Sequence, residues 1–236
     1  KKKCSFIELN NNNNNNNNEN SIITMENDNS AVNVKFSNPV FNKTGGSGSL
    51  EKEDFFLKLE GGTATLDDST PNSIAYIDST SSYQLSISIT GTPDGYEKLS
   101  VSPSANSIYD AADNIANTEQ AINSTNLIDK ALPVIKSIDI ASSNATVTVN
   151  LSEPVFSTAF GIGELSFADF LLTIAGGTAN LPLPFPDGIT KTNDSTFVLG
   201  IKTEGIQSGR EQLTVRPSPG AVYDRAGNAA DFFSQH

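Results

Sequence analysis

The chain has almost none of the side chains that most enzyme and metal sites use. It contains one cysteine, Cys4, one histidine, His236, and no tryptophan. A lone cysteine excludes a disulfide within the chain and a cysteine-based metal site. One histidine at the last position provides no base for a Ser-His-Asp arrangement and too few ligands for zinc. Gly45, Gly46 and Gly48 are not followed by the lysine of a phosphate-binding loop. We therefore expect no enzymatic activity.

Positive charge and long apolar runs are also scarce. The chain has 15 Lys and Arg against 27 Asp and Glu, a net charge of −12, and its only basic cluster is residues 1–3. This composition predicts no nucleic-acid partner and no binding to an anionic membrane. No apolar run approaches the 18 residues that a membrane-spanning helix needs, so we expect no membrane insertion. An acidic surface is typical of a soluble exterior or of a protein that binds divalent cations.

What the chain does contain is a long internal repeat. Residues 108–114 read Ile-Tyr-Asp-Ala-Ala-Asp-Asn, and residues 222–228 read Val-Tyr-Asp-Arg-Ala-Gly-Asn. The flanking matches pair 34–41 with 149–156, 61–66 with 176–181, and 97–104 with 211–218. A self-match at one long separation indicates tandem repeats, and the repeat length is that of an ordinary domain. We predict a first repeat at 21–129 and a second at 130–236, after a leading segment at 1–20.

The leading segment combines a strand candidate with a homopolymer. Residues 4–9 read Cys-Ser-Phe-Ile-Glu-Leu, and residues 10–18 are all asparagine. An asparagine run has no apolar side chain to bury, so we interpret it as a linker or disordered tract. The alternative is a β-prone asparagine ladder.

Short strands with turn signals between them dominate both repeats. Apolar and polar residues alternate at 31–36, 83–89 and 197–201, which is typical of half-buried strands. Residues 57–60 and 63–66, joined by Gly61 and Gly62, suggest a hairpin. No stretch shows helical periodicity beyond one turn. The pattern predicts an all-β protein made of two antiparallel β-sandwiches.

The repeated motifs also resemble a known family. Ser-x-Pro-Val-Phe, Asp-Phe, Gly-Gly-Thr-Ala, Glu-x-Leu-x-Val-x-Pro-Ser and Tyr-Asp-x-Ala-x-Asn occur in this order in both copies. They are similar to the bacterial immunoglobulin-like repeats of large cell-surface proteins, including the cyanobacterial swimming-motility type. The resemblance covers about 22–236 and implies tandem Ig-like sandwiches on secreted or surface-anchored proteins. Asp113 departs from the motif, where the second copy has Gly227, so it must tolerate a left-handed turn.

Carboxylates that recur in both copies are the candidate site residues. Glu97 and Glu211 begin strands and point the same way as the core residues that follow them. Such a carboxylate must be satisfied by backbone N–H groups or by a cation. The aspartate of each Tyr-Asp motif fits an Asx turn, or calcium shared with the asparagine four residues later. The calcium candidates are Glu97, Asp110, Asn114, Glu211, Asp224 and Asn228.

The second copy lacks an equivalent of residues 123–128 before His236. We interpret the chain as part of a longer array. The alternative is that the open sheet edge is completed by residues 6–9 of a neighbouring copy.

The functional expectation is a structural spacer of an extracellular or cell-surface adhesin, stalk or fibre, with neighbouring repeats as its partners. Two alternatives remain. One is a protein- or glycan-binding module acting through loops that differ between the copies, such as 67–73 and 182–188. The other is a fibre subunit that associates with other copies by strand exchange.

Overall fold

The computed structural model describes residues 23–78, 81–118 and 124–233. The chain divides into two compact units, Lys1–Lys130 and Ala131–His236, which are described separately. Both units are built almost wholly from antiparallel strands. The only helical turns in the described residues are the 3-10 turns η1 (Lys52–Asp54) and η2 (Phe167–Asp169). The all-β prediction is therefore confirmed. The strand candidate at 4–9 and the asparagine run lie outside the described residues.

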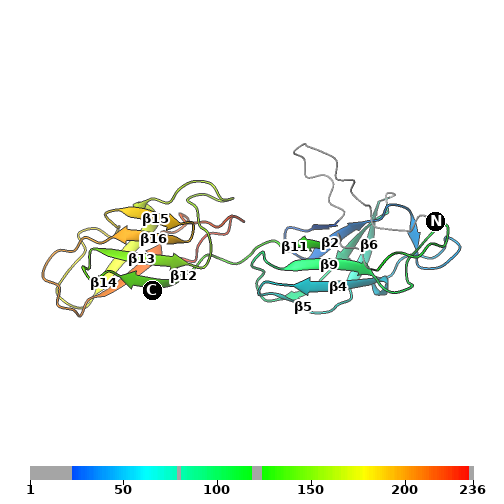
Figure 1. Ribbon diagram of the computed structural model, residues 1–236, viewed down its shortest axis with the longest axis horizontal. Coiled ribbons are helices and arrows are strands. Elements are labelled where there is room, and N and C mark those ends of the chain that lie inside the picture. Colours follow the sequence, from blue (N-terminus) through cyan, green and yellow to red (C-terminus); the bar gives the residue numbers. More distant parts are fainter. Residues whose placement is uncertain (1–22, 79–80, 119–123, 234–236) are drawn as a thin grey trace. The chain divides into compact units, whose positions relative to one another are not determined.

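The first unit contains two main antiparallel sheets (Figure 1). The four-stranded sheet has the order β1 (Ile23–Met25), β2 (Ala31–Lys35), β7 (Ser82–Ser86) and β6 (Ser73–Asp78). The three-stranded sheet has the order β11 (Ser124–Asn126), β9 (Lys98–Pro103) and β4 (Phe55–Glu60). Two short pairs join β10 (Tyr109–Asp110) to β3 (Val40–Phe41) and β5 (Thr65–Leu66) to β8 (Ile89–Thr90).

The second unit repeats the order of the four-stranded sheet, and isolated bridges, Phe156 to Tyr223 and Asn180 to Glu204, replace the two short strand pairs. Its four-stranded sheet runs β12 (Ile135–Ile140), β13 (Thr146–Leu151), β16 (Thr196–Gly200) and β15 (Ile189–Asn193). Its second sheet pairs β14 (Phe170–Ala175) with β17 (Gln212–Pro217). Among the described residues, nothing in this unit corresponds to β11, so β17 has a strand partner on one side only.

Each unit has its own apolar core between its sheets. In the first unit, Val34 and Leu85 of the four-stranded sheet belong to one buried cluster with Leu57 and Val101 of the other. In the second unit, Val149, Leu199, Leu172 and Val215 occupy the matching places. Strand side chains alternate between faces, so this pattern buries one face of each sheet. The arrangement is consistent with a β-sandwich.

The hairpin predicted around Gly61 and Gly62 is wrong. Both glycines have the positive φ that suggested a turn, 80° and 61°. However, β4 pairs with β9, and β5 pairs with β8 instead of folding back on β4. The N–H groups of Thr63 and Ala64 donate to the side chain of Glu97, so they are not available to a β4 ladder. The hydrogen bonds to Glu97, more than thirty residues away, therefore hold residues 63–64 away from β4.

The tight turn at Asp113 is confirmed. Asp113 has φ 58° where Gly227 has φ 99°, and both precede the asparagine of the repeated motif. The Asp113 carboxylate accepts a hydrogen bond from the N–H of Gly45, 2.5 Å away. This contact with a neighbouring loop stabilises a left-handed conformation that a non-glycine residue adopts only at a cost.

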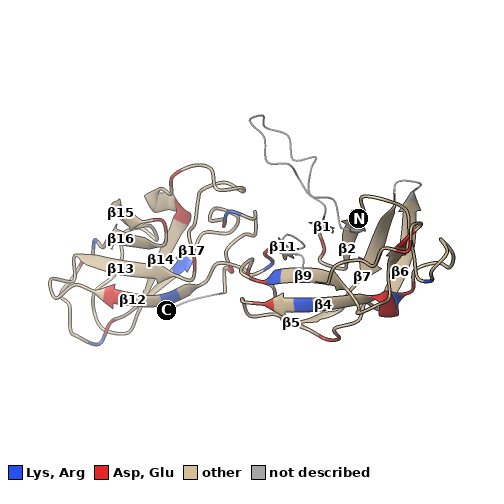
Figure 2. Ribbon diagram, turned by 45° about the vertical axis from the view of Figure 1, so that its right-hand side comes forward, with Lys and Arg blue, Asp and Glu red and all other residues tan. Residues whose placement is uncertain are grey.

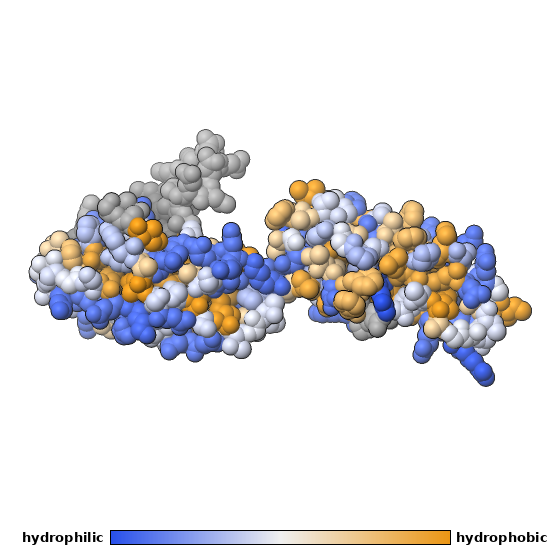
Figure 3. Space-filling model, turned by 180° about the vertical axis from the view of Figure 1, so that it is seen from behind, coloured by the Kyte–Doolittle hydropathy of each residue, from blue (hydrophilic) through white to orange (hydrophobic). Residues whose placement is uncertain are grey.

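The surfaces of both units are mixed. Figure 2 shows Asp and Glu spread over separate places on both units, with Lys and Arg between them. Figure 3 shows apolar residues as areas interrupted by polar ones. Within the described residues, no helix has the length and apolar character needed to span a membrane.

Candidate functional site

A buried glutamate fastens two loops together at one end of the first unit. Glu97 is fully buried and directly precedes β9. Its Oε1 accepts hydrogen bonds from the backbone N–H groups of Thr63 (2.9 Å), Ala64 (2.9 Å) and Asp94 (3.2 Å). Its Oε2 accepts from Asp94 (3.1 Å) and Gly95 (3.1 Å). Burial acts to raise the pKa of Glu97, but these N–H donors outweigh burial and lower the pKa below its ordinary value.

Glu211 has the same role in the second unit. Its Oε1 accepts from the N–H groups of Thr178 (2.9 Å), Ala179 (3.1 Å) and Ser208 (2.9 Å). Its Oε2 accepts from the N–H of Arg210 at 3.2 Å. The N–H groups of Ser208 and Thr178 contribute most to holding the pKa of Glu211 well below its ordinary value. Unlike Glu97, the Glu211 side chain is only half-buried.

Glycines next to these glutamates are required by the close approach of the backbone. A Cβ on Gly62 would collide with the carboxylate of Glu97, and a Cβ on Gly177 would collide with that of Glu211. Both glycines also have φ 61°, a conformation that favours glycine. The repeated Gly-Gly-Thr-Ala motif is therefore a carboxylate-binding loop within each unit.

The structure shows how Glu97 and Glu211 are satisfied. Of the two alternatives given by the sequence, backbone N–H groups or a cation, it shows the backbone N–H groups. Within the described residues, neither glutamate belongs to a cluster of three or more potential metal-binding side chains. Calcium at these two positions stays a prediction.

The aspartates of the Tyr-Asp motif close local turns. Asp110 Oδ1 accepts from the N–H of Ala112 and of Asn114, both at 2.9 Å, and Oδ2 accepts from Asn114 Nδ2 at 2.9 Å. The amide of Asn114 is the main cause of the lowered pKa of Asp110. Asp224 is fastened in the same way by Asn228, with 2.8 Å to its N–H and 2.7 Å to its Nδ2. The Asx-turn interpretation is confirmed for Asp110, which accepts from the N–H two residues on. Asp224 accepts from the N–H groups of Gly227 and Asn228, three and four residues on.

The neighbouring tyrosines are tethered to the same turns. The hydroxyl of Tyr109 donates to the carbonyl of Asn106 at 2.9 Å, and that of Tyr223 donates to the carbonyl of Gly220 at 3.0 Å. Each tyrosine hydroxyl is therefore held by the backbone of its own turn. The structure therefore brings Asp110 to Asn114 and Asp224 to Asn228, as the repeat predicted.

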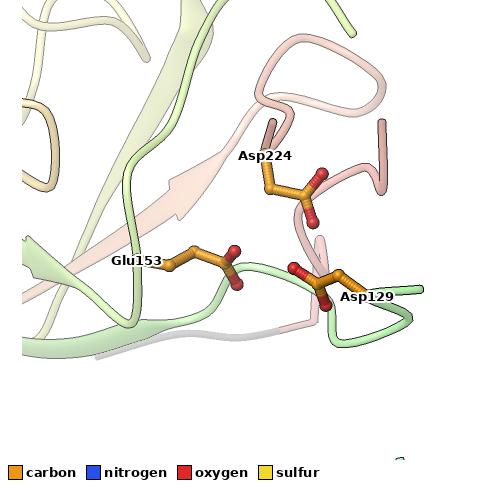
Figure 4. Close-up of side chains that lie close together, drawn as sticks. All are labelled: Asp129, Glu153 and Asp224. Carbon is orange, nitrogen blue, oxygen red and sulfur yellow. The ribbon is translucent and has the colours of Figure 1, made fainter. Parts of the chain in front are cut away.

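A second carboxylate lies beside Asp224. The side chain of Glu153 has an oxygen within 4.8 Å of one from Asp224, which is buried (Figure 4). Asp129, the third side chain labelled there, belongs to the first unit. The sequence analysis did not single out Glu153. The available signal was its place in the Ser-Glu-Pro motif, where the first copy has Asn38.

A pocket of mixed polarity opens at the Glu211 end of the second unit. It has a volume of about 240 Å³. Its apolar lining residues include Ile140, Ile174, Ile201 and Leu213, and its polar ones are Asn144, Thr203, Gln207 and Glu211. The sequence analysis did not identify this pocket, because its residues come from several strands that only the fold brings together.

Comparison with known proteins identifies no relative of the chain. No protein-family model, no curated protein and no solved structure matches it.

Proposed function

We propose that the chain is a non-catalytic structural segment of an extracellular or cell-surface adhesin, stalk or fibre, made of two Ig-like sandwich repeats that act as a spacer. The observation that carries this proposal is the duplicated unit. The four-stranded sheets of both units have the same strand order, and in both units a corresponding glutamate and a corresponding Asp-Asn pair hold the loops.

Internal fastening of this kind suits a segment that bears load. Glu97 joins the loop after β4 to the turn before β9 through backbone hydrogen bonds to both. Hydrogen bonds to a charged acceptor are among the stronger ones in proteins. A unit whose loops are held this way keeps its length when pulled. The near absence of histidine and cysteine supports a non-catalytic role, because nucleophilic and metal catalysis use these residues most often.

Single-molecule force spectroscopy tests the spacer role. We expect two separate unfolding steps when the full chain is stretched, one for each unit. A unit of this size gains about 350 Å of contour length at ~3.5 Å per residue. Glu97→Gln is expected to lower the unfolding force of one step only. A chain that extends without a force peak would contradict the proposal. Antibody labelling of intact producing cells tests its surface location.

A second candidate function is protein binding through the loop at 182–188. Leu183 and Phe185 in this loop are 65% and 39% exposed. The corresponding residues 67–73 of the first unit read Asp-Asp-Ser-Thr-Pro-Asn-Ser. Exposed apolar side chains in one copy only are typical of a recognition loop. Glycan arrays and pull-downs with the chain and its Leu183→Ser variant test this candidate, and it fails if both screens stay blank.

A further inference from the structure

The first unit contains a pocket formed by strands β3, β6 and β7 and by the loop at 48–50. Its volume is about 360 Å³, which lies within the range of about 300–1,000 Å³ that is usual for ligand pockets. Its polar lining residues are Ser49, Tyr76, Ser81 and Tyr83, and all four carry hydroxyl groups. None of the described residues that line it is charged.

Two tyrosines of this pocket form an aromatic pair. Tyr76 of β6 lies opposite Tyr83 of β7, so both side chains are on the same face of the sheet. Their ring centroids are 5.3 Å apart. Tyr83 is buried and packs edge-on against the ring of Phe36 in the core, whereas Tyr76, on the edge strand of the sheet, is 59% exposed. The core thus fixes Tyr83, and Tyr83 supports an aromatic ring that is open to solvent.

The lining of this pocket favours an uncharged ligand. A charged group that leaves water needs a partner of opposite charge, and the described lining offers none. Burial raises the pKa of Tyr83 above its ordinary value, and the nearby Tyr76 adds to this effect. The Tyr83 hydroxyl therefore stays protonated at neutral pH, and it can donate a hydrogen bond to a ligand oxygen.

The second unit builds the same place from different residues. The registers of the β6–β7 and β15–β16 pairs give two counterparts, and the repeated Gly-x-Leu sequence of the loop gives a third. From the first unit to the second, the changes are Tyr76 to Lys191, Tyr83 to Phe197 and Ser49 to Glu164. Every one of these changes removes a hydroxyl group.

In the second unit an ion pair joins the two sides of this place. Lys191 Nζ lies 3.3 Å from Glu164 Oε1 and 2.7 Å from Asp194 Oδ1. Phe197 is buried in the core without any hydroxyl. The common fold therefore requires neither the exposed ring of Tyr76 nor the hydroxyl of Tyr83. Features that one copy has and the shared fold does not need are typical of a binding site.

We propose that this pocket of the first unit binds a neutral sugar unit of a glycan. A sugar ring has an apolar face of C–H groups and a rim of hydroxyl groups. The apolar face fits the exposed ring of Tyr76, and the rim fits the uncharged hydroxyl groups of Tyr83 and Ser49. The proposal does not depend on the spacer role, and it concerns a different unit from the loop at 182–188.

A glycan array with the full chain tests the class of ligand. The probes are neutral gluco-, galacto- and manno-oligosaccharides, and we expect binding to at least one of them. Calorimetric titration with the strongest-binding probe then tests the site. Tyr76→Ala is expected to weaken binding about tenfold, which corresponds to about 1.4 kcal/mol. Lys191→Ala, the matched change in the second unit, is expected to leave the affinity unchanged.

A second variant transfers the ion pair of the second unit into the pocket. The full chain with Ser49→Glu and Tyr76→Lys carries the residues of the closed copy, and we expect it to lose binding to the array. Both positions are exposed, so the urea midpoint of the first unit should stay the same and show that the variant is folded. Retained binding by this folded variant would overturn the proposal.

Three other results would also overturn it. One is an array on which the full chain binds no neutral oligosaccharide. Another is binding that Leu183→Ser abolishes and Tyr76→Ala leaves unchanged, which would place the glycan on the loop at 182–188. The third is binding of a labelled ten-residue polyproline peptide that Tyr76→Ala weakens, with no oligosaccharide bound, which would show that the pocket accepts a peptide.

Discussion

Glu97→Gln is a sharp test of how the first unit is held together. Glutamine keeps the size of the side chain but turns one acceptor oxygen into an NH₂ donor. The carboxylate accepts from Thr63, Ala64, Asp94 and Gly95, so either orientation of the amide sets a donor against two or more N–H groups. The side chain is fully buried, and no solvent replaces the lost partners. Hydrogen bonds to charged groups contribute about 1.5–3 kcal/mol each, so the free energy of unfolding should fall by about 3–5 kcal/mol.

Urea denaturation followed by circular dichroism measures this effect. The two units are expected to unfold in separate steps, and Glu97→Gln should move one midpoint and leave the other unchanged. Glu211→Gln is the matched control: its side chain is only half-buried, and water can replace part of the lost bonding. It should move the other midpoint by less. If Glu97→Gln lowers the free energy of unfolding by less than about 1 kcal/mol, which is below the contribution of one charge-assisted hydrogen bond, the reasoning is refuted.

Three further predictions follow from the same contacts. Gly62→Ala should destabilise the first unit more than Gly45→Ala, because both have positive φ but only a Cβ on Gly62 meets the Glu97 carboxylate; urea midpoints check this. The pKa values of Glu97 and Glu211 are lowered in the folded state, so the unfolded chain takes up more protons as pH falls. The unfolding free energy should therefore be fully present above about pH 5 and decline below about pH 4.3, and Glu97→Gln should flatten that decline. If the repeated carboxylates bind calcium, excess calcium should raise the thermal midpoint by several degrees over chelator; equal midpoints would contradict the calcium prediction.

The repeat carried most of what the sequence could predict about this chain. Alternation at 31–36, 83–89 and 197–201 predicted strands because a strand with one buried face must alternate, whatever it pairs with. For the recurring glutamates and aspartates the sequence predicted either backbone N–H partners or a cation, because a buried carboxylate must be satisfied and aspartate readily closes a turn on the backbone. These features depend on residues that are neighbours in the sequence, or on the repeat, and the sequence alone shows both.

Tertiary structure decided the features that depend on distant partners. The Gly61-Gly62 turn resembled a hairpin, but the N–H groups after it bond to Glu97, over thirty residues away, and β4 pairs with β9. Asn29 and Asn144 occupy matching positions in the two copies, but their surroundings differ. The side-chain amide of Asn29 hydrogen-bonds to the carbonyl and the N–H of Ile128, whereas Asn144 is exposed. Pairing partners and pockets arise from segments far apart in the chain, whose contacts are selected by the whole packed unit. For that reason local patterns determined the strands, and only the fold determined which strands pair and which loops each carboxylate holds.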